Sequence, residues 1–110
     1  MFFKKHYVKI VKNIKSKNEL FEYISKIIQE NNLIDNVDII FQELQKRESQ
    51  GSTGFENGIA IPHSMINGLK ESVLLFFKTN DINWESLDGN PTNDVFVILI
   101  PQIQIIMICI

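Results

Sequence analysis

The chain has a single cysteine, Cys109, among its 110 residues, and this excludes an intrachain disulfide. So little cysteine fits a reducing compartment, and we expect a cytoplasmic location. The chain also lacks any run of 18 or more apolar residues, and no apolar segment of signal-peptide length follows its N-terminal lysines. We therefore expect no direct membrane insertion.

Charge of one sign is also scarce. The chain carries 11 basic and 13 acidic residues for a net charge of −2, and the basic residues do not gather into one long stripe. This pattern argues against a nucleic-acid partner. Hydrophobic residues make up 45% of the chain and charged residues 22%, which is typical of one small globular domain and too apolar for disorder.

Glycine and proline are few, and most of the glycines lie shortly before one histidine. Of five glycines, three lie within residues 51–58, directly before Ile59-Ala60-Ile61-Pro62-His63. The glycines and polar residues predict a loop over 49–58, and the short apolar run predicts a buried strand over 59–62. Pro62 has no N–H for a central ladder, so the strand should end there and leave His63 at the surface.

A histidine in this position suits group transfer. Near neutral pH an imidazole has an unprotonated nitrogen that can act as a nucleophile. The other ring nitrogen must be held by an acceptor, and we expect a nearby backbone carbonyl to do this. The glycine-rich loop offers backbone N–H groups that can approach an anion closely. Together these features favour acceptance and onward transfer of a phosphoryl group at His63.

The remaining pattern predicts strands and amphipathic helices. Ser16, with Glu19 three positions later, has the spacing of a capping box, and Asp35 or Asn36 can cap a second helix. We expect strands at 7–11, 72–78 and 95–100, helices at 17–31 and from about 36 to 48, a turn at Gly68, and a loop over 80–93 with a turn at Asp88-Gly89. This mixture predicts an α/β fold, a mixed β-sheet flanked by helices.

The segment from Gly51 to His63 resembles the phosphorylation motif of the fructose/mannitol-type IIA domain of the bacterial sugar phosphotransferase system. Arg47-Glu48, residues 82–91 and the apolar strand 95–101 support the resemblance, which covers roughly residues 6 to 101. It implies a mixed sheet with helices packed on it. It also implies that the residue matching His63 accepts a phosphoryl group from the carrier HPr and passes it to a IIB domain. That domain in turn phosphorylates the sugar during its transport through the IIC membrane permease.

The resemblance also implies roles for the residues around His63. Arg47 would contact the phosphoryl group, and its planar fork suits a bidentate contact with phosphate oxygens. Hydroxyl groups of Thr53 and Ser52, and the loop at Gly54 and Asn57, are candidate phosphoryl contacts, although each could instead serve only the geometry of the loop. No metal or organic cofactor is expected.

Other residues receive more ordinary interpretations. His6 is interpreted as incidental, and the loop carboxylates Asp81, Glu85 and Asp88 as solvated rather than metal-binding. Trp84 and Leu87 are expected to anchor their loop on the core. An apolar rim around the glycine-rich loop is expected to dock HPr and IIB. This rim consists of Phe55, Ile59, Met65 and Ile66.

The end of the chain departs from the family pattern. Residues 1–101 are expected to form the N-terminal two-thirds of the family domain, and residues 102–110 an atypical, uncharged apolar tail. The family's second active-site histidine and the secondary structure that follows it have no counterpart here, so we expect a C-terminal truncation that leaves the fold incomplete at its C-terminus; a true final strand is the alternative. Three hypotheses remain: a phosphocarrier, which leaves open whether the chain should count as an enzyme; a regulatory IIA-like binding module; or an inactive remnant.

Overall fold

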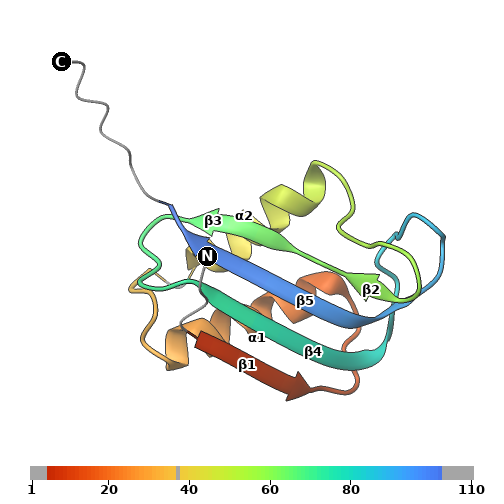
Figure 1. Ribbon diagram of the computed structural model, residues 1–110, viewed down its shortest axis with the longest axis horizontal. Helices are drawn as coiled ribbons and strands as arrows, with labels where there is room; N and C mark the ends of the chain where they lie inside the picture. The colour runs from red at the N-terminus through yellow and green to blue at the C-terminus, as the bar shows by residue number, and fades with distance from the viewer. Residues whose placement is uncertain (1–4, 37, 103–110) are drawn as a thin grey trace.

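A computed structural model describes residues 5–36 and 38–102 of the chain. The predictions for Val37, Cys109 and all but the first residue of the apolar tail lie outside these residues. The elements in chain order are β1 (Lys5–Ile10), α1 (Lys17–Glu30), α2 (Asp38–Ser49), β2 (Ile59–Ala60), β3 (His63–Ile66), β4 (Val73–Ile82) and β5 (Thr92–Pro101), as Figure 1 shows.

The strands form one mixed sheet in the order β1-β4-β5-β2, and β3 also pairs with β5. The β4–β5 pair is antiparallel, whereas β1 runs parallel to β4, and β2 and β3 run parallel to β5. β2 and β3 therefore share one edge of the sheet. The α/β fold that the sequence predicts, a mixed sheet with helices, is confirmed.

Helix α1 begins and ends where its sequence predicts. The Ser16 side chain accepts a hydrogen bond of 3.2 Å from the backbone N–H of Glu19, and Asn31 forms the C-cap. The Glu19 carboxylate reaches back one residue further than in a standard capping box, to the backbone N–H of Lys15 at 3.2 Å. At α2, Asn36 rather than Asp35 accepts from the backbone N–H of Asp38, at 3.3 Å.

Both helices lie on one face of the sheet (Figure 1), and the hydrophobic core fills the space between the helices and the sheet. The apolar residues of α1 recur at helical spacing, and Leu20, Ile24 and Ile28 are fully buried. From the sheet, alternate residues point inward. They are Val73, Leu75 and Phe77 of β4 and Val95, Val97 and Leu99 of β5, all with no exposed surface.

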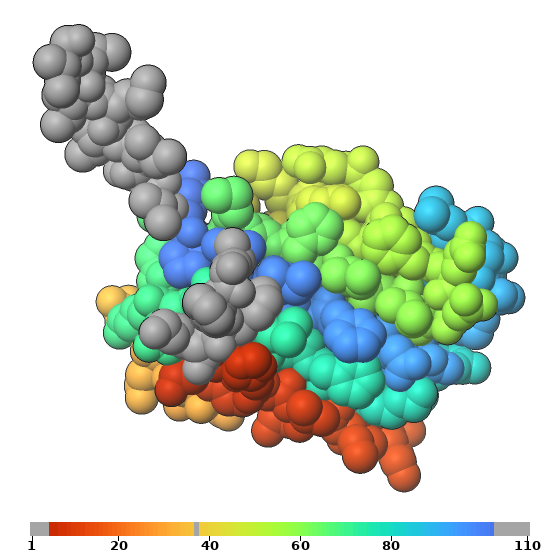
Figure 2. Space-filling view, in the orientation of Figure 1, coloured from red at the N-terminus to blue at the C-terminus, as the bar shows by residue number. Residues whose placement is uncertain are grey.

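The opposite face of the sheet carries apolar side chains too. Phe76 and Phe96 face each other across β4 and β5 with ring centroids 4.8 Å apart, and Val8 on β1 is 73% exposed. Among the described residues no helix covers this face, which is turned toward the viewer in Figure 2. None of the described helices is long and apolar enough to span a membrane.

Candidate functional site

The edge strand is interrupted just before His63. β2 ends at Ala60, which is in register with Val95 of β5, and pairing resumes at His63, which is in register with Ile98. Pro62 keeps the interruption hydrogen-bonded, because its carbonyl accepts from the N–H of Ile98 at 3.0 Å. The prediction of a strand over 59–62 is therefore wrong in its last two residues, and His63 begins a strand instead of following one. Proline interrupts the pairing, but the chain stays extended beside β5.

The His63 ring is fixed by one hydrogen bond. Its Nδ1 lies 2.8 Å from the backbone carbonyl oxygen of Ile61, and the residue is exposed. A carbonyl oxygen can only accept, so this contact assigns the hydrogen to Nδ1 and leaves Nε2 with a free lone pair. The acceptor that the sequence analysis expects for the ring is thus a carbonyl two residues earlier.

Arg47 and His63 line the same open groove, of about 410 Å³, between the C-terminal end of α2 and strand β3. The groove is lined by Glu43, Lys46, Arg47, Gln50, His63, Ser64, Met65 and Gln102. The Nη1 of Arg47 donates to the carbonyl of Gly51 at 2.9 Å, which ties the guanidinium to the loop that follows α2. The remaining N–H groups of a guanidinium can bind an anion.

Ser52 and Thr53 do not line this groove. The Ser52 hydroxyl donates to the carbonyl of Trp84 at 2.9 Å and accepts from the N–H of Gly54 at 3.1 Å. The Thr53 side chain is buried, donates to the carboxylate of Glu48 at 2.5 Å and accepts from the Trp84 indole N–H at 3.0 Å. In this arrangement both hydroxyls join loops together, and their contact with a phosphoryl group stays a prediction.

Glu48 is a residue of this region to which sequence reasoning gave no role of its own. Its side chain is only 7% exposed and forms an ion pair with Lys17 at 3.1 Å. It also accepts from the backbone N–H of Thr53 at 3.0 Å. The available signal was its place next to Arg47 at the end of a helix, but the sequence does not show that the carboxylate turns inward.

Gly54 and Asn57 shape the loop. A side chain at Gly54 would meet the Cα of Ser86 at 2.9 Å, so this position needs glycine. Asn57 has a φ of 61°, a left-handed conformation that asparagine tolerates well, and its N–H donates to Asp88 at 3.1 Å. Their contact with a phosphoryl group likewise stays a prediction.

The backbone N–H of Asn90, and after it that of Asn57, lowers the pKa of Asp88 below its usual value of 3.8. Because the folded state favours the charged form, these contacts stabilise the fold at pH values above 3.8. Their contribution is lost as the pH falls through the lowered pKa.

The predicted anchors of the loop after β4 behave differently from each other. Trp84 is fully buried and packs edge-on against Phe21, with ring centroids 5.9 Å apart, so its anchoring role is confirmed. Leu87 is 77% exposed, so its anchoring role is wrong. It precedes the turn at Gly89 and lines an apolar hollow with Phe55.

The apolar rim is exposed in two of its four members. Phe55 is 46% and Met65 58% exposed, and Ile59 is half-buried. Ile66 is fully buried, because it stands one residue from Met65 on β3 and therefore points to the other face of the sheet. The prediction of Ile66 as a surface residue is wrong.

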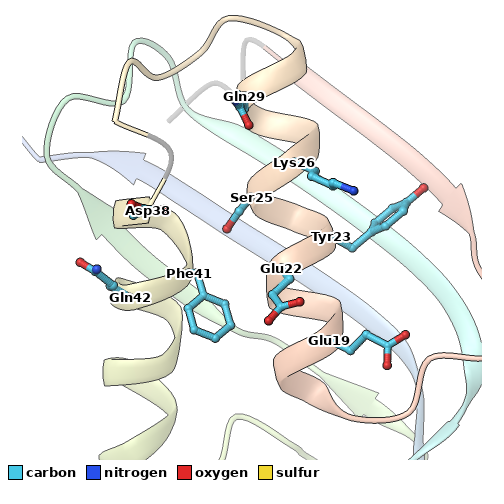
Figure 3. A pocket seen from close by; sticks show the side chains of 9 residues that line it. All are labelled: Glu19, Glu22, Tyr23, Ser25, Lys26, Gln29, Asp38, Phe41 and Gln42. Carbon is cyan, nitrogen blue, oxygen red and sulfur yellow. The ribbon is translucent and has the colours of Figure 1, made fainter.

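A separate hollow of about 540 Å³ lies between α1 and α2 (Figure 3). Its lining includes Glu19, Glu22 and Asp38, but none of the residues predicted to contact a phosphoryl group. Within residues 5–36 and 38–102, no three His, Cys, Asp or Glu side chains are grouped so that they could hold a metal ion. His63 and Arg47, which the sequence predicts to accept and to contact a phosphoryl group, lie in the groove beside β3.

Comparison with known proteins places the chain in a family. The family model described as "Phosphoenolpyruvate-dependent sugar phosphotransferase system, EIIA 2" matches residues 1–106. A fructose-specific EIIABC component of the same kind of system, from Mycoplasma pneumoniae, is 30% identical over 93 residues, which are 84% of this chain and 13% of that protein.

Other relatives carry a regulatory name. A nitrogen regulatory protein of Pseudomonas aeruginosa is 34% identical over 88 residues, which are 79% of this chain and 57% of that protein. The crystal structure of the nitrogen regulatory protein IIA-Ntr from Neisseria meningitidis superposes with a TM-score of 0.78 at 31% identity. The match covers 90% of this chain and 67% of that one. The chain thus spans between an eighth and about three-fifths of the length of these curated relatives.

Proposed function

The chain belongs to the EIIA 2 family of the phosphoenolpyruvate-dependent sugar phosphotransferase system, and we propose that it carries a phosphoryl group on Nε2 of His63. The group would come from phospho-HPr and pass to a IIB domain that serves uptake of a sugar of the fructose/mannitol class. The observation that carries this proposal is the hydrogen bond of 2.8 Å between His63 Nδ1 and the Ile61 carbonyl, which leaves Nε2 free.

The transfer step follows from this hydrogen bond. The Nε2 lone pair attacks phosphorus, a nitrogen–phosphorus bond forms, and the bond between phosphorus and the carrier breaks, with its electron pair returning to the carrier. The ring keeps its Nδ1 proton throughout. The Ile61 carbonyl therefore stabilises the positive charge that develops on the imidazole as Nε2 gives up its electrons. Onward transfer to IIB is the same displacement with the histidine as leaving group.

Arg47 is proposed to neutralise the transferring oxygens. In the transition state, the transferring phosphoryl group carries its charge on three equatorial oxygens. Catalysis depends on the positioning of the reacting groups and on cations near these oxygens. Arg47 shares the groove with His63, and its hydrogen bond to Gly51 holds the guanidinium in place without using its other donors.

The proposal is tested by locating the label. The purified chain is incubated with enzyme I, HPr and labelled phosphoenolpyruvate, then digested in neutral solution, because phosphohistidine is labile in acid. We expect the added phosphoryl mass on the peptide that contains His63, and loss of that mass when a IIB domain is added. Label on the His6 peptide, or no label on folded protein, would contradict the proposal.

Replacing Arg47 by alanine is expected to slow the phosphorylation of His63 by about 100-fold or more, the usual effect of removing one donor from a developing negative charge. The initial rate of label transfer from phospho-HPr measures this. Arg47→Lys should recover only part of the rate, because an ammonium cannot make a bidentate contact.

The matched control for Arg47 is Lys46→Ala. Lys46 lies in the same last turn of α2 and lines the same groove, so its loss removes an equal charge from the neighbourhood. An equal fall in rate for both variants would mean that Arg47 contributes only its positive charge and makes no specific contact with the phosphoryl group.

A regulatory module is the second candidate. It is favoured by the nitrogen regulatory names of the Pseudomonas relative and of the Neisseria structure. Such a module would bind a target protein differently before and after phosphorylation. Affinity capture with both forms tests it: recovery of IIB alone argues against this candidate, and a partner that binds only one form supports it. A folded chain that accepts no label would instead favour the inactive remnant.

A further inference from the structure

We propose that Glu48 is a positioning residue for His63, acting through Thr53 and Ile61 on the tautomer of the ring. The inference rests on the proposed function, because it concerns the nitrogen that would accept the phosphoryl group. No contact joins Glu48 to the ring directly in the described hydrogen bonds. The connection is a short relay, and each of its steps is a hydrogen bond in the structure.

The first step joins Glu48 to Thr53. One carboxylate oxygen accepts from the Thr53 N–H at 3.0 Å and the other from the Thr53 hydroxyl at 2.5 Å. A carboxylate that holds both the backbone and the side chain of one residue fixes that residue in orientation as well as in place. The Trp84 indole N–H, 3.0 Å from the same hydroxyl, fixes the direction in which the hydroxyl donates.

The second step joins Thr53 to the carbonyl that holds His63. The Thr53 carbonyl accepts from the N–H of Ile61 at 3.0 Å, and the Ile61 carbonyl in turn lies 2.8 Å from His63 Nδ1. Ile61 stands in the gap between β2 and β3, so it is outside the regular pairing of these strands with β5. The N–H of Ile61 is therefore bound by Thr53, on the side away from β5, while the neighbouring Pro62 carbonyl is bound by Ile98 of β5.

Charge and burial make Glu48 suited to this task. Its side chain is 7% exposed, and Lys17, 19% exposed, neutralises it at 3.1 Å. Lys17 Nζ also lies 3.2 Å from the Trp84 carbonyl, so the start of α1, the end of α2 and the loop after β4 meet at this carboxylate. A charge buried with so many partners holds them in one geometry, since each partner would be left unsatisfied elsewhere.

The position of the Ile61 carbonyl determines which of the two nitrogens of the neutral His63 ring carries the hydrogen. If the Ile61 carbonyl turns away, the neutral ring can place its hydrogen on Nε2, and an Nε2–H has no lone pair with which to attack phosphorus. Glu48 would thus raise the fraction of rings that are competent for transfer, without touching the phosphoryl group. Small displacements of a reacting group cost up to about 100-fold in rate.

The test is a tautomer measurement combined with a rate. Long-range proton–nitrogen correlation spectra of the His63 ring are recorded at a pH where it is neutral, in the unmodified chain and in Glu48→Gln. The glutamine keeps the shape but replaces one acceptor oxygen by a donor. We expect the Nδ1–H form in the unmodified chain, a mixture with the Nε2–H form in Glu48→Gln, and phosphorylation about 10-fold to 100-fold slower.

The control and a second variant make the outcome decisive. Glu43→Gln removes the same charge from the same helix, in the groove itself, and is expected to leave the tautomer unchanged. A folded Glu48→Gln with an unchanged tautomer overturns the inference, whatever its rate. If Glu48→Gln does not fold, Thr53→Val takes its place; it loses the hydroxyl bonds to Glu48 and to the Trp84 indole but keeps the backbone bond to Glu48. An unchanged tautomer in Thr53→Val is then the overturning result.

The inference and the proposed function fail separately. A chain that shows the tautomer shift in Glu48→Gln, yet accepts no phosphoryl group even when unmodified, loses the proposed function but keeps the relay. A chain whose His63 is labelled, but whose tautomer does not shift in Glu48→Gln, keeps the proposed function and loses the relay.

Discussion

Replacing His63 by alanine is expected to stop the chain from accepting a phosphoryl group, with a fall in initial rate of about 1000-fold or more. The variant loses the only group that forms a bond to phosphorus in the proposed step. Arg47 and the loop remain, but they can only stabilise a transfer for which no acceptor is left. Label transfer from phospho-HPr is the measurement, with circular dichroism to show that the variant is folded.

Two further variants separate the nucleophile from its surroundings. His63→Asn keeps a side-chain N–H that could donate to the Ile61 carbonyl, so it preserves that contact while removing the nucleophilic nitrogen. It should be as inactive as the alanine variant. His6→Ala removes the other histidine of the chain and should be labelled at the normal rate. Undiminished labelling of His63→Ala would require another acceptor and would end the assignment.

The elements that the sequence predicts well are those that its local pattern decides. The Ser16 cap and the helical recurrence of Leu20 and Ile24 set the position of α1 without help from distant residues. β3 was missed because its four residues acquire strand structure from pairing with β5, more than thirty residues later. The sequence predicts that β4 ends at Lys78, but it continues to Ile82 through an irregularity at polar residues 79–81, because Lys78 and Ile82 are both in register with β5. Long-range pairing outweighs local propensity there.

The apolar runs in β4 and β5 have side chains on both faces of the sheet. A run that is apolar at every position predicts a strand covered on both faces. The structure covers the inner residues, such as Val97, whereas Phe96 on the outer face stays 37% exposed among the described residues. The apolar runs therefore predict that a second layer covers this outer face. That expectation stays a prediction.

The candidate site also has a part that the sequence predicts and a part that depends on long-range structure. His63 could be predicted because a histidine after a glycine-rich loop carries its chemistry in its own side chain. The relay behind it could not, because Glu48 and Trp84 meet at Thr53 only after the sheet and both helices have assembled. The serine and threonine of the loop looked like phosphate ligands by type. In the structure their hydroxyls are hydrogen-bonded to Trp84 and Glu48, which depends on where those residues lie in space, and their contact with a phosphoryl group stays a prediction.

Trp84 is expected to be the residue whose loss most weakens the fold. Trp84→Ala should lower the free energy of unfolding by about 3–5 kcal/mol, the usual cost of emptying a fully buried aromatic site. The side chain has no exposed surface and packs against Phe21. Its loss would also leave the Thr53 hydroxyl without its 3.0 Å donor. Trp84→Phe should cost less, since the ring fills most of the space and mainly the N–H is lost, worth about 1–2 kcal/mol.

Urea unfolding followed by circular dichroism measures these differences, because Trp84 is the only tryptophan and its fluorescence disappears with the substitution. Leu87→Ala is the matched control in the same loop. Leu87 is 77% exposed, so its truncation should change stability by no more than about 0.5 kcal/mol. Equal losses for the two alanine variants would mean that the loop is anchored through Leu87 after all. A stable Trp84→Ala would mean that the loop and the relay at Thr53 are held without the indole, and the relay would then depend on Glu48 alone.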